Sequence, residues 1–321
     1  MPSIAMKLRF GLVVLAAMLA LGSAAARADD HLRVGKAVGG PFDFVPLDVG
    51  VAKGFFKQHG IDVEEVDFGG SAKLQQALGA DAIDVGLGSG PELAFVAKGN
   101  SDLAIAAFAG RPNSQVLVVR ADGPIRTTAD LKGKTVGIST VGSLTDWLVR
   151  ELSRQQGWGP DGIATVALGS GAARAAALRT GSADGVVTDV ASAVVLGNSK
   201  IGRTIVHFGT VAPDFIIHAI FATNQAIAER PDVLKRFLAG WFETINWMRA
   251  NKDATVAIAA PAMHRAPDIV AANYDQTMGD FSTTGRFEPK ALAVLARSFV
   301  EMKILPSAPD MSKLYTEKLL P

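Results

Sequence analysis

Gly54-Phe55-Phe56-Lys57-Gln58-His59-Gly60-Ile61-Asp62-Val63 joins the end of one predicted helix to the start of a predicted strand. The helix is predicted over residues 44–56 and is closed by His59-Gly60, because glycine commonly ends a helix. A strand over residues 32–38 precedes this helix, and another over residues 61–68 follows it directly. Strand, helix and strand in close succession predict two parallel strands joined by a crossover helix.

The same alternation continues on both sides of this stretch, so the sequence predicts an α/β fold with largely parallel sheets. Further strands are predicted over residues 83–87, 103–108, 115–119, 135–139, 164–168 and 185–188. Further helices are predicted over residues 72–78, 91–97, 143–156, 172–178 and 190–196. The C-terminal third is helical: an apolar stripe follows Pro231 at helical spacing, which indicates core packing for Trp241.

Two parts of the chain resemble each other. Ala77-Leu78-Gly79 with Asp84-Val85-Gly86 ends a helix and begins a strand, and Ala177-Leu178 with Gly181 and Asp184-Gly185-Val186 does the same. Two similar lobes that face each other across a cleft would produce this likeness. A chance similarity between any two βα units is the open alternative.

The first 28 residues predict export. Lys7 and Arg9 precede an apolar run over residues 10–21, and Ala26-Arg27-Ala28 forms a small-residue cleavage site. This order is typical of a secretory signal peptide, which places the mature protein in the periplasm. A membrane anchor is the alternative, but an anchor needs about 20 apolar residues.

Composition excludes several classes of function. The chain has 321 residues, with 32 basic residues against 31 acidic ones; without Lys7, Arg9 and Arg27, 29 basic residues remain and the net charge becomes −2. A protein this close to neutral is not built to bind nucleic acid. The absence of cysteine excludes disulfides, thiolate metal sites and cysteine nucleophiles.

Catalytic and cofactor motifs are missing as well. The sequence contains no H-E-x-x-H, G-x-S-x-G or S-x-x-K, and its five histidines lack the spacing of metal ligands. Gly133-Lys134-Thr135 does not complete a phosphate-binding loop, and neither Gly86-x-Gly88-x-x-Pro91 nor Gly169-x-Gly171-x-x-Arg174 has the third glycine of a dinucleotide site. The sequence therefore predicts no enzyme, no metal and no cofactor.

Small polar residues recur where a predicted strand ends and a helix begins. Ser89-Gly90-Pro91-Glu92 is a capping box, and Ser143 caps the next such helix with Asp146 at the third helical position. Free backbone amides at these junctions favour anions, and the carboxyl ends of parallel strands are where ligands bind in open sheets. The alternative for each cap is that it serves only to end its helix; we therefore expect a binding site only if several junctions converge.

Four motifs resemble the type 2 periplasmic solute-binding proteins of ABC importers, in the branch for sulfonates, taurine, nitrate and thiamine-precursor pyrimidines. Residues 54–63 are similar to its G-F-F-x-x-x-G-[LI]-x-V motif, and Asp130-Leu131-Lys132-Gly133-Lys134-Thr135-Val136 to its D-L-K-G-K-x-[VI] motif. Ala177-Leu178-x-x-Gly181-x-x-Asp184 and Trp247-Met248-x-x-Asn251 also resemble family segments. The likeness spans most of the chain after residue 28.

This resemblance implies two α/β lobes joined by a two-strand hinge. Lobe I would hold residues 29–120 and 222–321, and lobe II residues 121–221, with crossings near residues 119–122 and 219–223. The implied ligand-binding residues are Phe42, Phe44, Gly70, Ser71 and Ser89 in lobe I, and Gly142, Ser143, Thr145 and Asp189 in lobe II. Arg111 is added as the nearest cation at a strand end, although a surface role is equally open. For Phe42 and Phe44 the alternative is a packing role, and for Asp189 it is a helix cap.

The implied function is a monomeric receptor that passes a small ligand to an ABC permease in the inner membrane, driven by a cytoplasmic ATPase. We expect a small organic anion or zwitterion, with a pyrimidine-like heterocycle as the alternative. A chemosensory binding protein is a further alternative. An enzyme on the same fold is disfavoured, because the related pyrimidine-forming synthases carry a cysteine-rich motif and this chain has no cysteine.

Overall fold

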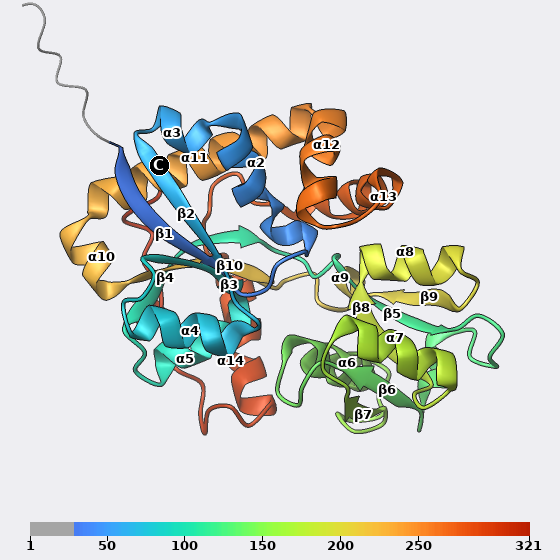
Figure 1. Ribbon diagram of the computed structural model, residues 1–321. Helices are drawn as coiled ribbons and strands as arrows, with labels where there is room; N and C mark the ends of the chain where they lie inside the picture. The colour runs from blue at the N-terminus through green and yellow to red at the C-terminus, as the bar shows by residue number, and fades with distance from the viewer. Residues whose placement is uncertain (1–28) are drawn as a thin grey trace, which may run out of the picture.

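The computed structural model describes residues 29–321 as two lobes, each built on one five-stranded sheet with helices on its faces (Figure 1). The predicted signal peptide, residues 1–28, lies outside the described residues. Within residues 29–321, no helix has both the length and the hydrophobicity required to cross a bilayer. The predicted α/β architecture with two lobes is confirmed.

The first lobe contains the sheet β2-β1-β3-β10-β4. Its strands are β1 (Asp30–Lys36), β2 (Ile61–Asp67), β3 (Val85–Ser89), β4 (Asp102–Ala109) and β10 (His218–Thr223). Its helices are η1 (Phe42–Phe44), α2 (Val45–Lys53), α3 (Phe55–Gln58), α4 (Ser71–Gly79), η2 (Gly90–Glu92), α5 (Leu93–Ala97), α10 (Asn224–Glu229), α11 (Pro231–Ala250), α12 (Lys252–Ala262), α13 (Pro267–Thr277), η4 (Met278–Asp280), α14 (Pro289–Glu301) and η5 (Met311–Lys313). β1 is parallel to β2 and β3, whereas β10 is antiparallel to both β3 and β4.

The second lobe contains the sheet β7-β6-β8-β5-β9. Its strands are β5 (Gln115–Arg120), β6 (Thr135–Ile138), β7 (Ala164–Ala167), β8 (Gly185–Asp189) and β9 (Gly202–His207), and its helices are η3 (Thr128–Leu131), α6 (Leu144–Gln155), α7 (Gly171–Thr180) and α8 (Val190–Asn198). β6 is parallel to β7 and β8, and β5 is antiparallel to β8 and β9. In each sheet, four strands therefore run one way and one strand runs the other.

The two sheets have the same topology, because β1, β2, β3, β10 and β4 occupy the positions of β6, β7, β8, β5 and β9. The strand that runs against the others is in each case the one that follows a crossing from the opposite lobe. The two similar sequence segments, residues 77–86 and 177–186, correspond to α4 followed by β3 and to α7 followed by β8. The likeness between these two segments thus reflects equivalent places in two lobes.

The chain crosses between the lobes earlier than the sequence predicted. Residues 110–114 join β4 to β5, and residues 208–217, which include α9 (Phe208–Val211), join β9 to β10. The predicted crossings near residues 119–122 and 219–223 fall on strands that are already paired within one sheet. The boundary at residue 120 therefore assigns β5 to the wrong lobe, and the boundary at residue 221 divides β10. The sequence misplaced the crossings because an apolar strand such as β5 has the same hydrophobic pattern whichever sheet it joins.

Local sequence explains where the helices end and what they bury. The helix predicted over residues 44–56 is divided at Gly54, whose φ of 73° lies in the left-handed region that glycine tolerates. Pro231 occupies the first turn of α11 as predicted, where its missing N–H costs nothing. Trp241 and the rest of the apolar stripe on α11 are fully buried, which confirms the predicted core role.

Candidate functional site

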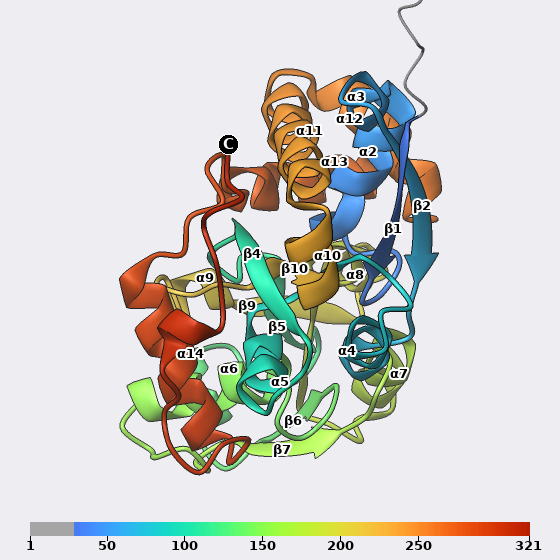
Figure 2. The same cartoon turned by 90° about the vertical axis from the view of Figure 1, so that its left-hand side faces the viewer.

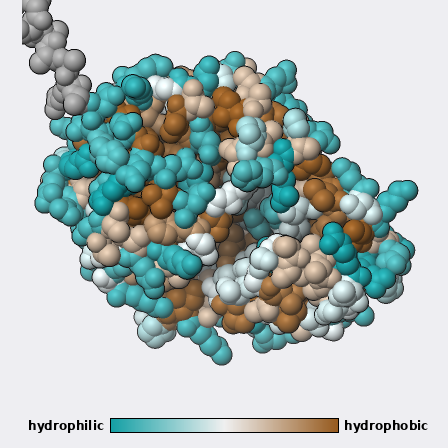
Figure 3. Space-filling view, in the orientation of Figure 1, coloured by the Kyte–Doolittle hydropathy of each residue, from teal (hydrophilic) through white to brown (hydrophobic). Residues whose placement is uncertain are grey.

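The carboxyl ends of the four parallel strands in each sheet, and the amino end of the one antiparallel strand, lie on the side where the two lobes meet. In the second lobe, β5 starts at the crossing, and its first residue, Gln115, pairs with Asp189 at the end of β8. In the first lobe, β10 also starts at a crossing, and His218 pairs with Ser89 and Ala109 at the ends of β3 and β4. All ten predicted site residues lie at or after such strand ends. Figure 3 shows a hollow in the surface between the lobes.

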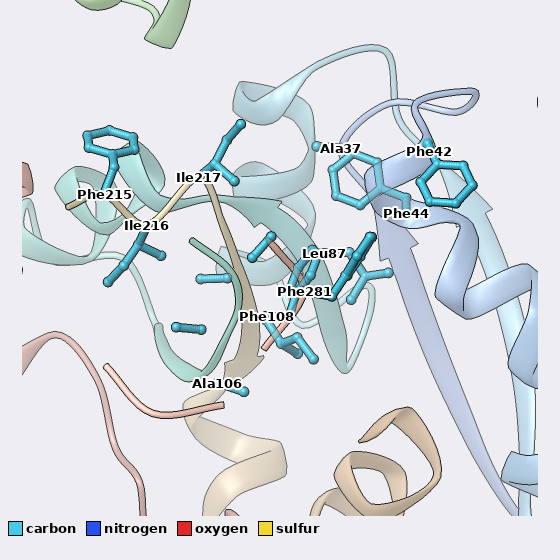
Figure 4. Close-up of a cluster of buried hydrophobic side chains, with 14 of the residues drawn as sticks. Ala37, Phe42, Phe44, Leu87, Ala106, Phe108, Phe215, Ile216, Ile217 and Phe281 are labelled. Carbon is cyan, nitrogen blue, oxygen red and sulfur yellow. The ribbon is translucent and has the colours of Figure 1, made fainter. Parts of the chain in front are cut away.

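Phe42 and Phe44 lie in the core of the first lobe. Phe42 packs edge-on against Tyr274 and Phe281, with ring centroids 6.0 and 6.2 Å away, and only 1% of it is exposed. Phe44 is 2% exposed and belongs, with Phe42 and Phe108, to the cluster of buried side chains in Figure 4. Its ring contacts those of Phe108 and His218. Both rings are therefore packed in the core next to the predicted site, which is the role that the sequence analysis gave as the alternative to ligand binding.

Between these two rings, Asp43 adds a buried carboxylate that the sequence did not single out. Its Oδ1 atom lies 3.5 Å from Nε2 of His218, whose Nδ1 lies 3.2 Å from the carbonyl oxygen of Gly88. The His218 ring also stacks on Phe108. Asp43 is thus fixed at the base of the first-lobe side of the cleft.

Ser71 and Ser89 converge on one buried carboxylate, that of Glu92. Oε1 of Glu92 accepts hydrogen bonds from the backbone N–H of Ser89 at 2.8 Å and from its hydroxyl at 3.1 Å. The Ser71 side chain lies close enough to Glu92 to lower the pKa of the same carboxyl. Gly70 holds the adjacent turn with a φ of 141°, and its N–H donates to the carbonyl of Ala37 at 2.8 Å. The amide of Gly70 is therefore already used within the lobe.

Three hydroxyls gather at the start of α6 in the second lobe. Oγ of Ser139, Oγ of Ser143 and Oγ1 of Thr145 lie 2.9 Å from one another. Ser143 caps the helix by accepting from the N–H of Asp146, as predicted, while the N–H of Gly142 donates to the Asp146 carboxylate at 2.9 Å. The rotatable hydroxyls, rather than the amide of Gly142, remain the groups able to contact a ligand.

Asp189 and Arg111 each have partners within the protein. Asp189 caps α8 by accepting from the N–H and the hydroxyl of Ser192, at 2.8 and 2.7 Å. Arg111 is exposed and lies close enough to Asp280 to lower the pKa of that carboxyl. Burial nevertheless raises the pKa of Asp280 overall, and its carboxylate accepts from Nδ2 of Asn113 at 2.8 Å.

Comparison with known proteins identifies the family. The family model described as NMT1/THI5 like matches residues 41–255. The chain belongs to this family. Among its relatives, a 4-amino-5-hydroxymethyl-2-methylpyrimidine phosphate synthase of Saccharomyces cerevisiae, THI11, is 26% identical over 131 residues, which are 40% of this chain. A Brucella abortus protein described as a candidate binding protein is 27% identical over 213 residues, which are 65% of this chain.

These matches cover only 38% of the yeast relative and 64% of the Brucella relative. The fold match is more extensive. The periplasmic aliphatic sulphonate binding protein SsuA of Escherichia coli superposes with a TM-score of 0.76 at 19% identity, over 89% of this chain and 92% of that one. This NMT1/THI5-like chain therefore has the two-lobed fold of periplasmic binding proteins.

Arg174 of this NMT1/THI5-like protein is a charged residue near the second-lobe strand ends that sequence reasoning missed. It lies in the first turns of α7, is half-buried, and donates to the carbonyl of Gly169. Its Nε atom is buried and has no hydrogen-bond partner among the described residues. Burial lowers the pKa of its guanidinium, while the Asp189 carboxylate opposes that shift. The detectable signal was its position after Gly169-Ser170-Gly171, which had been tested only as a dinucleotide motif.

The lobes of this NMT1/THI5-like protein also contact each other directly beside the cleft. On one side α8 packs against α13. On the other, α14 lies against α6 (Figure 2), where the Glu301 carboxylate accepts from Nε1 of Trp147 at 3.0 Å and from Arg154 at 2.7 Å. These contacts hold the polar strand ends of both lobes toward each other.

Proposed function

We propose that this protein is an exported, monomeric receptor that captures a small organic ligand between its lobes and delivers it to an ABC permease in the inner membrane, powered by a cytoplasmic ATPase. The observation that carries the proposal is the convergence of polar strand ends from two topologically equivalent sheets across a pair of crossing segments. A ligand that contacts both lobes would stabilise their closed arrangement.

We infer that the ligand carries an anionic group, such as a sulfonate. Arg174 supports this inference, because its half-buried guanidinium carries a positive charge and has N–H donors beyond the one used by the carbonyl of Gly169, which suits it to a charge-assisted hydrogen bond. The hydroxyls of Ser139, Ser143 and Thr145 lie on the same side of the cleft and add neutral donors. The name of the structural neighbour SsuA, an aliphatic sulphonate binding protein, agrees with this class.

A pyrimidine related to thiamine precursors is the second candidate. It is favoured by membership of the NMT1/THI5-like family and by the name of the yeast relative. Asp43 and Asp189 would then accept from ring amino groups. For either ligand we propose binding without catalysis, since the sequence has no cysteine for the motif expected of such synthases. Neighbouring genes for a permease and an ATPase would distinguish transport from a chemosensory role.

Isothermal titration of the chain from residue 29 onward tests this proposal with propanesulfonate, taurine, nitrate and 4-amino-5-hydroxymethyl-2-methylpyrimidine. For an anionic ligand, Arg174→Met is expected to weaken binding about tenfold to a hundredfold, the usual worth of a hydrogen bond to a charged group. Arg179→Met, at an exposed site on the same helix, is the matched control. Equal loss in both variants, or sulfonate binding unaffected by Arg174→Met, contradicts the anionic assignment.

A further inference from the structure

Glu92 is a buried carboxylate whose hydrogen bonds all point back into the first lobe. It is 2% exposed and accepts from three donors: the N–H of Ser89, the hydroxyl of Ser89, and Nε2 of Gln75 at 3.0 Å. The Ser71 side chain lies close enough to lower the pKa of the same carboxyl. Burial raises the pKa of Glu92 overall, while hydrogen bonding from Ser71, Ser89 and Gln75 lowers it. Oε1 accepts from the N–H of Ser89 and Oε2 from the amide of Gln75, and because an N–H group can only donate, the Ser89 hydroxyl donates to an oxygen that already serves as an acceptor.

The direction of these protons decides what the two serines offer to a ligand. A serine hydroxyl has one proton and two lone pairs. Ser89 gives that proton to Glu92, and Ser71 lies close enough to the same carboxylate to be directed in the same way, so their oxygens have only lone pairs left for the cleft. The start of α4 and the end of β3, where these residues lie, therefore form a wall of hydrogen-bond acceptors. Asp43, another acceptor, lies on the same edge of the sheet.

We propose that Glu92 sets the hydrogen-bond polarity of the first-lobe wall, so that Ser71 and Ser89 require an N–H or O–H donor from the ligand. This inference rests on the proposed function and adds to it the orientation of the ligand. The anionic group lies toward Arg174 in the second lobe, and a donor such as a protonated amine lies toward the first lobe. Glu92 acts through the serines and is a positioning residue.

An anionic oxygen placed against this wall would be disfavoured for a simple reason. To donate to it, Ser71 or Ser89 would have to turn its proton away from Glu92. A buried carboxylate would then lose one of its hydrogen bonds, which is costly in a site of low dielectric constant. Seryl side chains at strand ends thus do not favour an anion in this lobe, although the same residue type in the second lobe does.

Taurine and ethanesulfonate provide a direct test, because they share the sulfonate and differ by the amine. The wild-type chain is expected to bind taurine at least tenfold more tightly in isothermal titration. Ser89→Ala removes one wall acceptor and is expected to reduce this preference severalfold, mainly through weaker taurine binding. Glu92→Gln provides one acceptor oxygen in place of two, so rotatable serine protons are released toward the cleft and the preference falls toward unity.

Glu64→Gln, at an exposed carboxylate of β2, is the matched control and should keep the wild-type preference. If Glu92→Gln does not fold, as judged by circular dichroism, Ser89→Ala and Ser71→Ala still decide the question. Equal affinities for the two compounds, or a preference unchanged in the serine variants, would overturn the acceptor wall and leave the proposed receptor function standing. Failure of both compounds to bind the wild-type chain would instead contradict the anionic ligand itself.

Discussion

Asp102 lies at the start of β4 with no exposed surface, and burial raises the pKa of its carboxyl from an ordinary 3.8 to about 6. Nδ2 of Asn100 donates to Oδ1 at 2.6 Å, but Oδ2 is buried without a partner among the described residues. Nearby Glu92 adds like charge. The folded protein therefore binds a proton at Asp102 more tightly than the unfolded chain does.

The sign and size of the effect on stability follow from proton linkage. Between pH 4 and 6 the folded protein holds a proton that the unfolded chain has released, so raising the pH through this window lowers the free energy of unfolding. A shift of about two pKa units corresponds to about 3 kcal/mol. The side-chain amide introduced by Asp102→Asn does not titrate, so in this variant we expect this part of the pH dependence to disappear.

Urea-induced unfolding of the wild type and of Asp102→Asn at several pH values from 4 to 7 measures the effect. The variant's free energy of unfolding, relative to that of the wild type, should rise by about 3 kcal/mol across this range. A fixed packing cost of the amide would shift the whole curve without changing its slope. Asp62→Asn, at a side chain that is 71% exposed, is the control. Parallel profiles for wild type and Asp102→Asn would refute the reasoning.

Two further predictions concern how the lobes are held. In Gly90→Ala the new Cβ would lie 2.0 Å from the carbonyl oxygen of Ile216, in the segment that joins β9 to β10. Because backbone atoms cannot move away easily, we expect chemical unfolding to show a free energy of unfolding lower by several kcal/mol. Gly197→Ala is the control and should change this free energy little, because its Cβ would have no neighbour within 4 Å. Glu301→Ala removes the carboxylate of α14 that accepts hydrogen bonds from Trp147 and Arg154 of α6. The ligand-free chain should then show a larger radius of gyration in small-angle X-ray scattering. An unchanged radius would contradict the idea that this contact holds the two lobes together.

Much of the fold could be predicted because its determinants are local. The capping box of Ser89 and Glu92 and the cap of Ser143 were predicted from spacing alone, and both are present. The crossings were not, since pairing partners are set by contacts distant in sequence. β5 is an apolar run that could pair within either sheet, and only its place between β8 and β9 shows which lobe it completes.

The candidate site shows the same division between position and role. Strand ends placed Ser71, Ser89 and Asp189 correctly at the carboxyl edges of the sheets. What each side chain offers depends on its buried neighbours, which no local pattern specifies: Phe42 is covered by Tyr274 and Phe281. The dinucleotide motif gives no role to Arg174, because that motif is defined by its glycines and does not describe the side chains in the first turns of the helix that follows.

The two lobes use equivalent positions with opposite chemistry. Ser89 ends β3 and Asp189 ends β8, and each strand holds the same place in its sheet. In the first lobe the cap is a serine, Ser89, and the residue three positions later is an acid, Glu92. In the second lobe the cap is an acid, Asp189, and the residue three positions later is a serine, Ser192. In the first lobe the buried charge directs serine protons inward, whereas in the second the charge at the strand end lies near the guanidinium of Arg174. One topology used twice can therefore present acceptors on one wall and a cation on the other, which is the asymmetry that a ligand with two different ends requires.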